Sequence, residues 1–154
     1  METTLVFLKP DAVQRRLIGP ILSRIEQKGL QIVGAKLMKV SRDLAQRHYA
    51  EHEGKPFYEE LIRFVTSGPV LVLALRGVEA VAVTRKLVGA TNGRKAEPGT
   101  IRGDFGMSGG HNLIHASDSP ESAQRELAMW FSEGELVDDE PALNRWVYSP
   151  SDLG

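Results

Sequence analysis

Runs of apolar residues divide the chain into short segments of extended and of helical character. Stretches rich in β-branched and apolar residues predict four strands, at about residues 3–8, 30–40, 70–75 and 113–116. The first run stops at Lys9-Pro10, because proline lacks a backbone donor and restricts the residue before it. Val70–Leu75 is apolar throughout, so we expect a central strand there.

Apolar residues at helical spacing predict five helices. In the first, Ile18, Ile21, Leu22 and Ile25 share one face, and Gly29 suits the C-terminal cap. The other four cover about residues 41–49, 58–66, 79–88 and 120–131. Ser119 is placed to cap the last of them.

The resulting order, β-α-β-(α-α)-β-α-β-α, leaves two architectures open. Strands alternating with helices occur in doubly wound parallel sheets. Four strands in two β-α-β halves fit better, at this length, an α+β fold of the ferredoxin-like βαββαβ type, with a four-stranded antiparallel sheet and helices packed on one face. We find no internal repeat and no linker, so we expect a single domain over residues 1–154.

Residues 89–110 break the hydrophobic pattern. The segment carries glycines at 93, 99, 103, 106 and 109, together with Arg94, Lys95 and Arg102. A loop of this length inside a compact domain is either functional or disordered. Because it leads directly into the segment around His115, we favour a functional loop.

Composition and charge narrow the classes of function. The 154 residues are 42% hydrophobic and 25% charged, as in ordinary globular domains. A net charge of −1 argues against a protein that coats nucleic acid or an anionic membrane, so a bound anion needs a local cluster of cations. The absence of cysteine excludes disulfides and thiolate chemistry. With no signal-like N-terminus and no long apolar run, we expect a cytoplasmic protein without a membrane-spanning segment.

His115 is the candidate for covalent chemistry. A lone histidine on a short strand is more often a core residue. Here Ser117 follows, and Glu126 lies in helical register with Ala123 and Trp130, although a solvated helix face would also explain Glu126. A carboxylate that holds one imidazole nitrogen leaves the other free as a nucleophile.

Phosphoryl transfer also requires cations around the phosphate oxygens. The candidates are Lys9, Arg85 and Arg102, with Thr91 as a hydroxyl donor. No Walker loop and no protein-kinase signature is present. His48 and His52 are spaced i, i+4, but without an HExxH motif or a third ligand we expect an exposed helix there and no metal site.

These segments together resemble the nucleoside diphosphate kinase family. The most specific phrase is Asn112-Leu-Ile-His115-Ala-Ser117-Asp118, with Pro98-Gly99-Thr100-Ile101-Arg102-Gly103-Asp104-Phe105 upstream of it. Further matches are Lys9-Pro10-Asp11, His48-Tyr49, Pro56-Phe57, Ser67-Gly68-Pro69 and Gly89-Ala-Thr91-Asn92. They occur in family order and spacing, from Thr3 to about Tyr148.

The resemblance implies a ping-pong reaction. His115 would take the γ-phosphoryl group of a nucleoside triphosphate, typically ATP, and pass it to a nucleoside diphosphate. Mg²⁺ would be held mainly by the nucleotide phosphates. The implied roles place Lys9 and Asn112 at the sugar and transferred phosphate, Arg85, Thr91 and Arg102 at the β- and γ-phosphates, Phe57 and Leu61 at the base, Tyr49 as a donor near His115, and Ser117 and Glu126 behind its ring.

The resemblance also implies broad tolerance of base and sugar, because stacking on an aromatic ring accepts any base. Family members assemble from dimers into hexamers or tetramers. The tail, residues 143–154 with Trp146 and Tyr148, resembles the C-terminal arm of hexameric relatives, so we favour a homo-hexamer.

Three positions depart from the family pattern. Gly109 replaces an apolar side chain that is common opposite Phe57, which predicts a one-sided base sandwich. His111 stands where arginine is common, and Gly93 where proline is frequent, which predicts a softer positive field and a more mobile loop.

Two other functions stay open. The chain could be a catalytically silent relative that acts as an interaction or nucleic-acid-binding module, but such a copy should have lost His115, Lys9 or an arginine of the phosphate set, and all are present. A phosphohistidine hydrolase or a protein histidine phosphotransferase stays open as a secondary activity.

Overall fold

The computed structural model describes all residues, 1–154, and its centre is a four-stranded antiparallel sheet. The strands are β1 (Glu2–Leu8), β2 (Gln31–Lys39), β3 (Pro69–Gly77) and β4 (Ile114–Ala116), in the order β2-β3-β1-β4. Every neighbouring pair is antiparallel. The antiparallel, ferredoxin-like arrangement predicted from the sequence is therefore confirmed, and the parallel sheet is excluded.

The five predicted helices are present within one or two residues of their expected bounds. The helices are α1 (Pro10–Gln14), α2 (Ile18–Lys28), α3 (Arg42–His48), α4 (Tyr58–Val65), α5 (Ala80–Val88), α6 (Ile101–Phe105), α7 (Pro120–Trp130), α8 (Asn144–Val147) and α9 (Pro150–Leu153), with a 3₁₀ turn η1 (Ala50–His52). Helices α1 and α6, the turn η1 and the two short helices of the tail were not predicted from the sequence.

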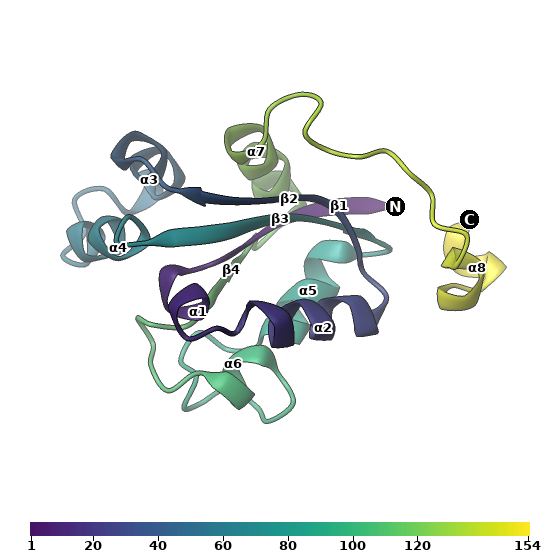
Figure 1. Cartoon of the computed structure of the whole chain (residues 1–154), viewed down its shortest axis with the longest axis horizontal. Coiled ribbons are helices and arrows are strands. Elements are labelled where there is room, and N and C mark those ends of the chain that lie inside the picture. Colours follow the sequence, from purple (N-terminus) through teal and green to yellow (C-terminus); the bar gives the residue numbers. More distant parts are fainter.

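Helices cover both faces of the sheet, so the expectation of helices on one face was wrong. Helices α2 and α5 lie on one side, and α3 and α7 on the other (Figure 1). Alternate side chains of β1 enter separate cores: Val6 and Leu8 pack with α2 and α5, whereas Leu5 and Phe7 pack with α3, α4 and α7. The extra helices between β2 and β3 bury the second face.

The central strand β1 brings distant segments together at one end of the sheet. In its pairing with β4, Phe7 lies opposite His115 and Leu8 opposite Ile114. Lys9 follows directly, and its backbone N–H donates to the carbonyl of Leu113. This pairing holds the first nine residues against the segment that carries the candidate nucleophile.

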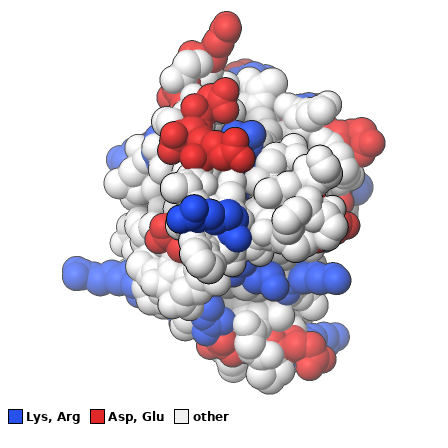
Figure 2. Space-filling model, turned by 90° about the vertical axis from the view of Figure 1, so that its right-hand side faces the viewer, with Lys and Arg blue, Asp and Glu red and all other residues white.

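The C-terminal tail crosses the molecule to the far side (Figure 1). The backbone N–H of Val137 donates to Val33 of the edge strand β2, and the hydroxyl of Tyr148 accepts from the backbone N–H of Val78. Acidic side chains gather towards the top of the face that includes the tail, with lysines and arginines below them (Figure 2). None of the helices combines the length and the apolar character that a membrane-spanning helix requires.

Candidate active site

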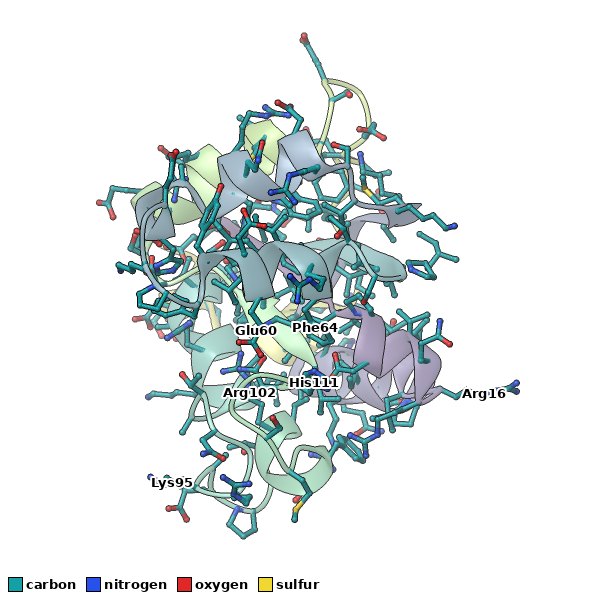
Figure 3. The ribbon with its side chains drawn as sticks, turned by 90° about the vertical axis from the view of Figure 1, so that its left-hand side faces the viewer. Arg16, Glu60, Phe64, Lys95, Arg102 and His111 are labelled. Carbon is teal, nitrogen blue, oxygen red and sulfur yellow. The ribbon has the colours of Figure 1, made fainter.

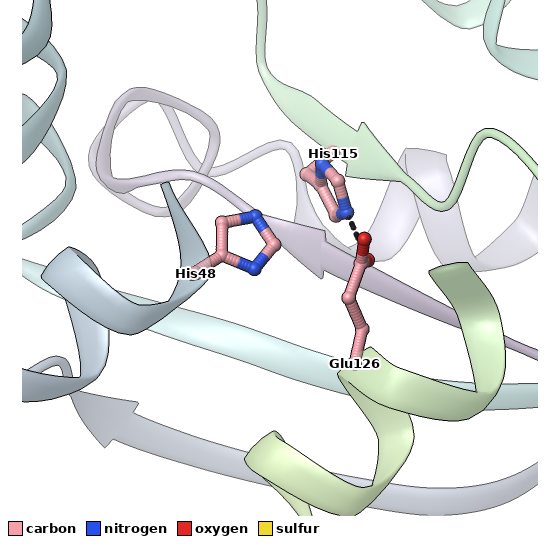
Figure 4. Close-up of side chains that lie close together, drawn as sticks. All are labelled: His48, His115 and Glu126. Atoms are coloured by element: carbon pink, nitrogen blue, oxygen red, sulfur yellow. Dashed lines mark hydrogen bonds and ion pairs between the residues drawn. The ribbon is translucent and has the colours of Figure 1, made fainter. Parts of the chain in front are cut away.

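His115 is held through one nitrogen by a buried carboxylate. Its Nε2 lies 2.6 Å from Oε1 of Glu126 (Figure 4), and the same oxygen accepts from the hydroxyl of Ser117 at 2.9 Å. Burial, followed by the charges of Lys9 and Arg102, lowers the pKa of His115 to about 3. The neutral ring therefore donates Nε2–H to the carboxylate and keeps a lone pair on Nδ1. This arrangement defines Nδ1 as the nucleophilic atom.

A strained turn directs the chain into this site. Leu113 is buried and has φ of 74°, in the left-handed region that non-glycine residues rarely adopt. Across it, the N–H of Ile114 donates to the carbonyl of Asn112, which also accepts from Nε of Arg102. The turn aims Asn112 and His115 at the same cavity, and the conformation is of the kind that persists at functional sites.

The cavity in front of His115 has a volume of about 330 Å³. Every residue predicted for the site lines it except Ser117, which is completely buried behind Glu126. The predicted residues around the cavity are Lys9, Tyr49, Phe57, Leu61, Arg85, Thr91, Arg102, Asn112, His115 and Glu126.

Three cations face the cavity, and none of them forms an ion pair. Lys9 donates to Oδ1 of Asn112 at 2.7 Å, and Arg85 to the carbonyl of Ala116 at 3.2 Å. Burial and the nearby Arg102 lower the pKa of Lys9 to about 8; burial and Arg85 lower that of Arg102 to about 10. Lys9 and Arg102 are buried and Arg85 is exposed, and positive charge in a cavity without a carboxylate partner is suited to a polyanionic ligand.

Arg102 also organises the loop that carries it. Its guanidinium donates to the carbonyls of Gly89, Asn112 and Ile114. The amide of Asn112 donates to the carbonyl of Thr91 at 3.0 Å. The expectation of a functional loop therefore has a structural basis, because residues 89–110 form one wall of the cavity.

The mouth of the cavity is apolar and open. Phe57 is 45% exposed and, with Leu61 and Gly109, also lines an adjoining cavity of about 380 Å³. The ring of His111 stacks on Phe64 at 4.4 Å. Figure 3 shows this pair near Glu60 at the mouth. Gly109 presents no side chain to the cavity, and the one-sided base sandwich stays a prediction.

Tyr49 lines the cavity but makes no hydrogen bond to His115. Burial raises the pKa of Tyr49 to about 12, so its hydroxyl keeps its proton. Its role as a donor stays a prediction.

The expectation that His48 lies on an exposed helix was wrong. His48 is 6% exposed, lines the cavity, and accepts a hydrogen bond at Nδ1 from the indole N–H of Trp130 at 3.0 Å. The missed signal is its register on α3, since Leu44 and Ala45, four and three residues earlier, are also buried.

His48, His115 and Glu126 each offer a ligand atom within 4.8 Å of the others, a spacing that resembles a metal site. The hydrogen bonds argue against it. Nδ1 of His48 faces the Trp130 donor, so its other nitrogen carries the proton. A metal ligand needs a free lone pair, and His48 in this tautomer offers none, which reduces the possible ligands to His115 and Glu126.

At one end of an antiparallel ferredoxin-like sheet, one cavity brings a neutral histidine close to three cations that have no carboxylate partner. This arrangement is that of a protein that binds a polyphosphate and attacks it through the histidine. The sequence model of the family described as nucleoside diphosphate kinase matches residues 2–136. A nucleoside diphosphate kinase of Bacillus licheniformis is 60% identical over 148 residues, which cover 96% of this chain and 100% of the relative. The chain therefore belongs to the nucleoside diphosphate kinase family.

Solved structures agree with this family. A halophilic nucleoside diphosphate kinase from Halobacterium salinarum, in complex with CDP, is 50% identical with a TM-score of 0.93, over 96% of this chain and 98% of that one. A family protein from Babesia bovis is 45% identical with a TM-score of 0.93, over 96% and 100% of the two chains. The predicted family and the prediction of an enzyme are confirmed.

Proposed function

We propose that the protein transfers the γ-phosphoryl group of a nucleoside triphosphate to a nucleoside diphosphate through a phosphohistidine on His115. The observation that carries this proposal is the pairing of Nε2 with Glu126, which leaves Nδ1 free before three cations without carboxylate partners. A silent interaction module would have no need of this arrangement.

In the first half-reaction, the lone pair of Nδ1 attacks the γ-phosphorus, and the bond from that phosphorus to the β–γ bridging oxygen breaks. The nucleoside diphosphate leaves with the electron pair of that bond. The ring becomes cationic, and Glu126 stabilises it through the Nε2–H it already accepts. In the second half-reaction, a terminal oxygen of the acceptor diphosphate attacks, the N–P bond breaks, and the electron pair returns to Nδ1.

The other residues of the cavity bind and align the nucleotide. Arg85, Thr91 and Arg102 hold the β- and γ-phosphates, where charge is spread over equatorial oxygens. Lys9 and Asn112, already bonded to each other, reach the sugar and the transferred group. Tyr49 donates to the phosphoryl group with a hydroxyl that stays protonated.

Phe57 and Leu61 receive the base, and we propose that the protein accepts purines and pyrimidines, with ribose or deoxyribose. The ring of Phe57 is at the open mouth, where a base stacks without having its edge read. The Halobacterium relative was solved in complex with CDP, a pyrimidine diphosphate, which supports this proposal. Similar kcat/KM for GDP and CDP is the expected result, and strict preference for one base would refute it.

A divalent cation, which we propose to be Mg²⁺, would enter with the nucleotide. Mg²⁺ takes oxygen ligands and usually keeps several waters. The hydroxyls of Ser122 and Ser119 lower the pKa of Asp118 at the cavity wall, and Glu126 bonds to His115. The donors present thus fit a cation held mainly by phosphate oxygens, where it neutralises charge on the leaving diphosphate.

We further propose a cytoplasmic homo-hexamer, with residues 143–154 as the arm that contributes to assembly. The exposed side chain of Trp146 supports an assembly role, since it is 79% accessible in the single chain. Light scattering that gave the mass of a tetramer would exclude the hexamer.

A single-turnover labelling experiment tests the reaction. The protein is incubated with Mg²⁺ and γ-labelled ATP, freed of nucleotide, and then given unlabelled GDP. We expect an acid-labile, alkali-stable label that moves to GTP and is absent from His115→Ala. Absence of label in folded wild-type protein would favour the silent interaction module.

A further inference from the structure

The tautomer of His48 is fixed by its neighbour. Trp130 Nε1 can only donate, and it lies 3.0 Å from Nδ1 of His48. Nδ1 must therefore present its lone pair, which places the proton of the neutral ring on Nε2. Burial, and then the neighbouring His115, lower the pKa of His48 to about 3, so the ring stays neutral at physiological pH.

The Nε2–H of His48 has no acceptor in the protein. The bond from Trp130 is the one hydrogen bond of this side chain, which is 6% exposed and lines the cavity. Its ring is 4.5 Å from that of His115 at 86°, and Figure 4 shows it directed towards His115 and Glu126. The donor is not among the enclosed polar atoms of the protein, so it is open to the cavity and available to a ligand oxygen there.

We propose that His48 donates Nε2–H to an oxygen of the phosphoryl group while His115 carries or receives that group. Trp130 is a positioning residue that keeps the donor on Nε2. This inference rests on the proposed phosphoryl transfer. The N–H bond of His48 stays intact throughout, and the contribution is a hydrogen bond to an oxygen whose charge changes during transfer.

A neutral donor complements the three cations. Lys9, Arg85 and Arg102 attract the polyphosphate before the reaction as well as during it, so they contribute to binding and to the rate. His48 lies beside the nucleophile and has no charge to attract the nucleotide from a distance. Its loss should therefore lower the rate of the chemical step more than the affinity for ATP.

Two substitutions at one position separate this role from a structural one. His48→Asn keeps an acceptor near the place of Nδ1, for Trp130, and removes the donor near the place of Nε2. His48→Gln keeps an amide donor near the place of Nε2 and removes the acceptor near Nδ1. If His48 only accepts the hydrogen bond from Trp130, Asn should be tolerated at position 48 and Gln should be harmful. If His48 donates to the phosphoryl group, the opposite order is expected.

The experiment is a rapid-quench measurement of phosphoenzyme formation over a range of Mg-ATP concentrations. We expect His48→Gln within about threefold of wild type, and His48→Asn at least tenfold slower at saturating ATP, approaching the roughly 10²-fold cost of losing one such donor. The half-saturating ATP concentration should change by less than about twofold. Trp130→Phe should slow the same step. The double variant with His48→Asn should be little slower than His48→Asn alone, because both substitutions remove the same interaction.

His48→Asn at the wild-type rate, or Gln slower than Asn, would overturn the proposal. A wild-type protein that acquires no label would instead refute phosphoryl transfer itself. If the variants do not fold, a measurement on the wild-type protein still tests the proposal. Nitrogen NMR of the imidazoles should show the Nε2–H tautomer of His48 and a shift of that resonance when His115 is phosphorylated; the other tautomer, or an unchanged resonance, would contradict the inference.

Discussion

At the scale of single residues, the carboxylate that contacts His115 is itself held in place. Glu126 comes from the inward face of α7, in register with Ala123 and Trp130, all three buried. Ser117 donates to the same oxygen of Glu126 that His115 Nε2 contacts. The carboxylate thus selects the tautomer and, in the proposed reaction, faces the positive charge that appears on the ring.

Glu126→Gln should slow phosphoenzyme formation by about 10²-fold, because a neutral amide neither fixes the tautomer as firmly nor stabilises the cationic ring. Ser117→Ala, which leaves the carboxylate in place, should cost only several-fold. Single-turnover rates at saturating ATP measure both effects. Equal losses in the two variants would show that the hydroxyl, and not the charge, is decisive.

The dependence of kcat/KM on pH should reflect Lys9 and not His115. With a pKa near 3, His115 stays neutral, so we expect no decline between about pH 8 and pH 5. With its pKa lowered to about 8, Lys9 loses its charge as the pH rises through that value, and kcat/KM should fall there. Lys9→Arg, whose charge persists, should lack the alkaline fall. An acid decline centred near pH 6.5 would contradict the burial of His115.

The sequence predicted the residues that line the cavity because a long motif fixes their spacing, whereas helical register left an inward and a solvent-facing orientation of Glu126 open. It did not predict the role of His48. The partner that explains His48 is Trp130, 82 residues away in sequence, and only the packing of α3 against α7 brings the two together.

At the scale of elements, α6 turns an aperiodic segment into part of the cavity wall. Thr100 caps it by accepting from the backbone N–H of Gly103, and Asp104 pairs with Arg24 of α2 at 2.6 Å. A helix of five residues completes too few turns to show a hydrophobic period, so the sequence suggested a loop. The same holds for α1. Coverage of both sheet faces was missed although α3, α4 and α7 each have an apolar side.

Gly103→Ala should disturb this wall. A Cβ at Gly103 would clash with the carbonyl of Glu97 and lie 2.7 Å from the hydroxyl of Thr100. We expect a loss of about 1–3 kcal/mol in the free energy of unfolding and a higher KM for ATP, since Arg102 is the next residue. Thermal unfolding measures the loss of stability, and steady-state kinetics measure the KM for ATP.

The matched control is Gly19→Ala in α2, where nothing lies within 4 Å of the added carbon. It should leave KM unchanged and raise stability by up to about 1 kcal/mol. If Gly103→Ala behaved like this control, α6 would be more adaptable than its contacts indicate.

At the scale of the whole molecule, the tail is fixed to the domain at Val147 and Tyr148, directly after an exposed Trp146. Tyr148 bonds to the backbone of Val78, and Val147 packs against Gly29, whereas Trp146 projects into solvent. The family model ends at residue 136, before this segment. A tail held in this way can present an apolar side chain to another subunit.

Trp146→Ala should therefore shift the protein towards smaller assemblies at a given concentration without changing its circular dichroism. Light scattering after size-exclusion chromatography measures the mass. Met107→Ala, which removes a side chain that is 73% exposed but lies away from the tail, is the control and should leave the mass unchanged. If Trp146→Ala had the wild-type mass at every concentration, the tail would not be part of the assembly interface.

The bond between Lys9 and Asn112 joins residues 103 positions apart, and β4 pairs only with β1. During synthesis, the first strand leaves the ribosome long before its partner exists. A nascent chain that has not yet exposed α7 lacks both the carboxylate of Glu126 and the part of the second core that α7 supplies. The nascent protein is therefore unable to consume cellular triphosphates until its last third has left the ribosome, and it acquires its activity in one late step.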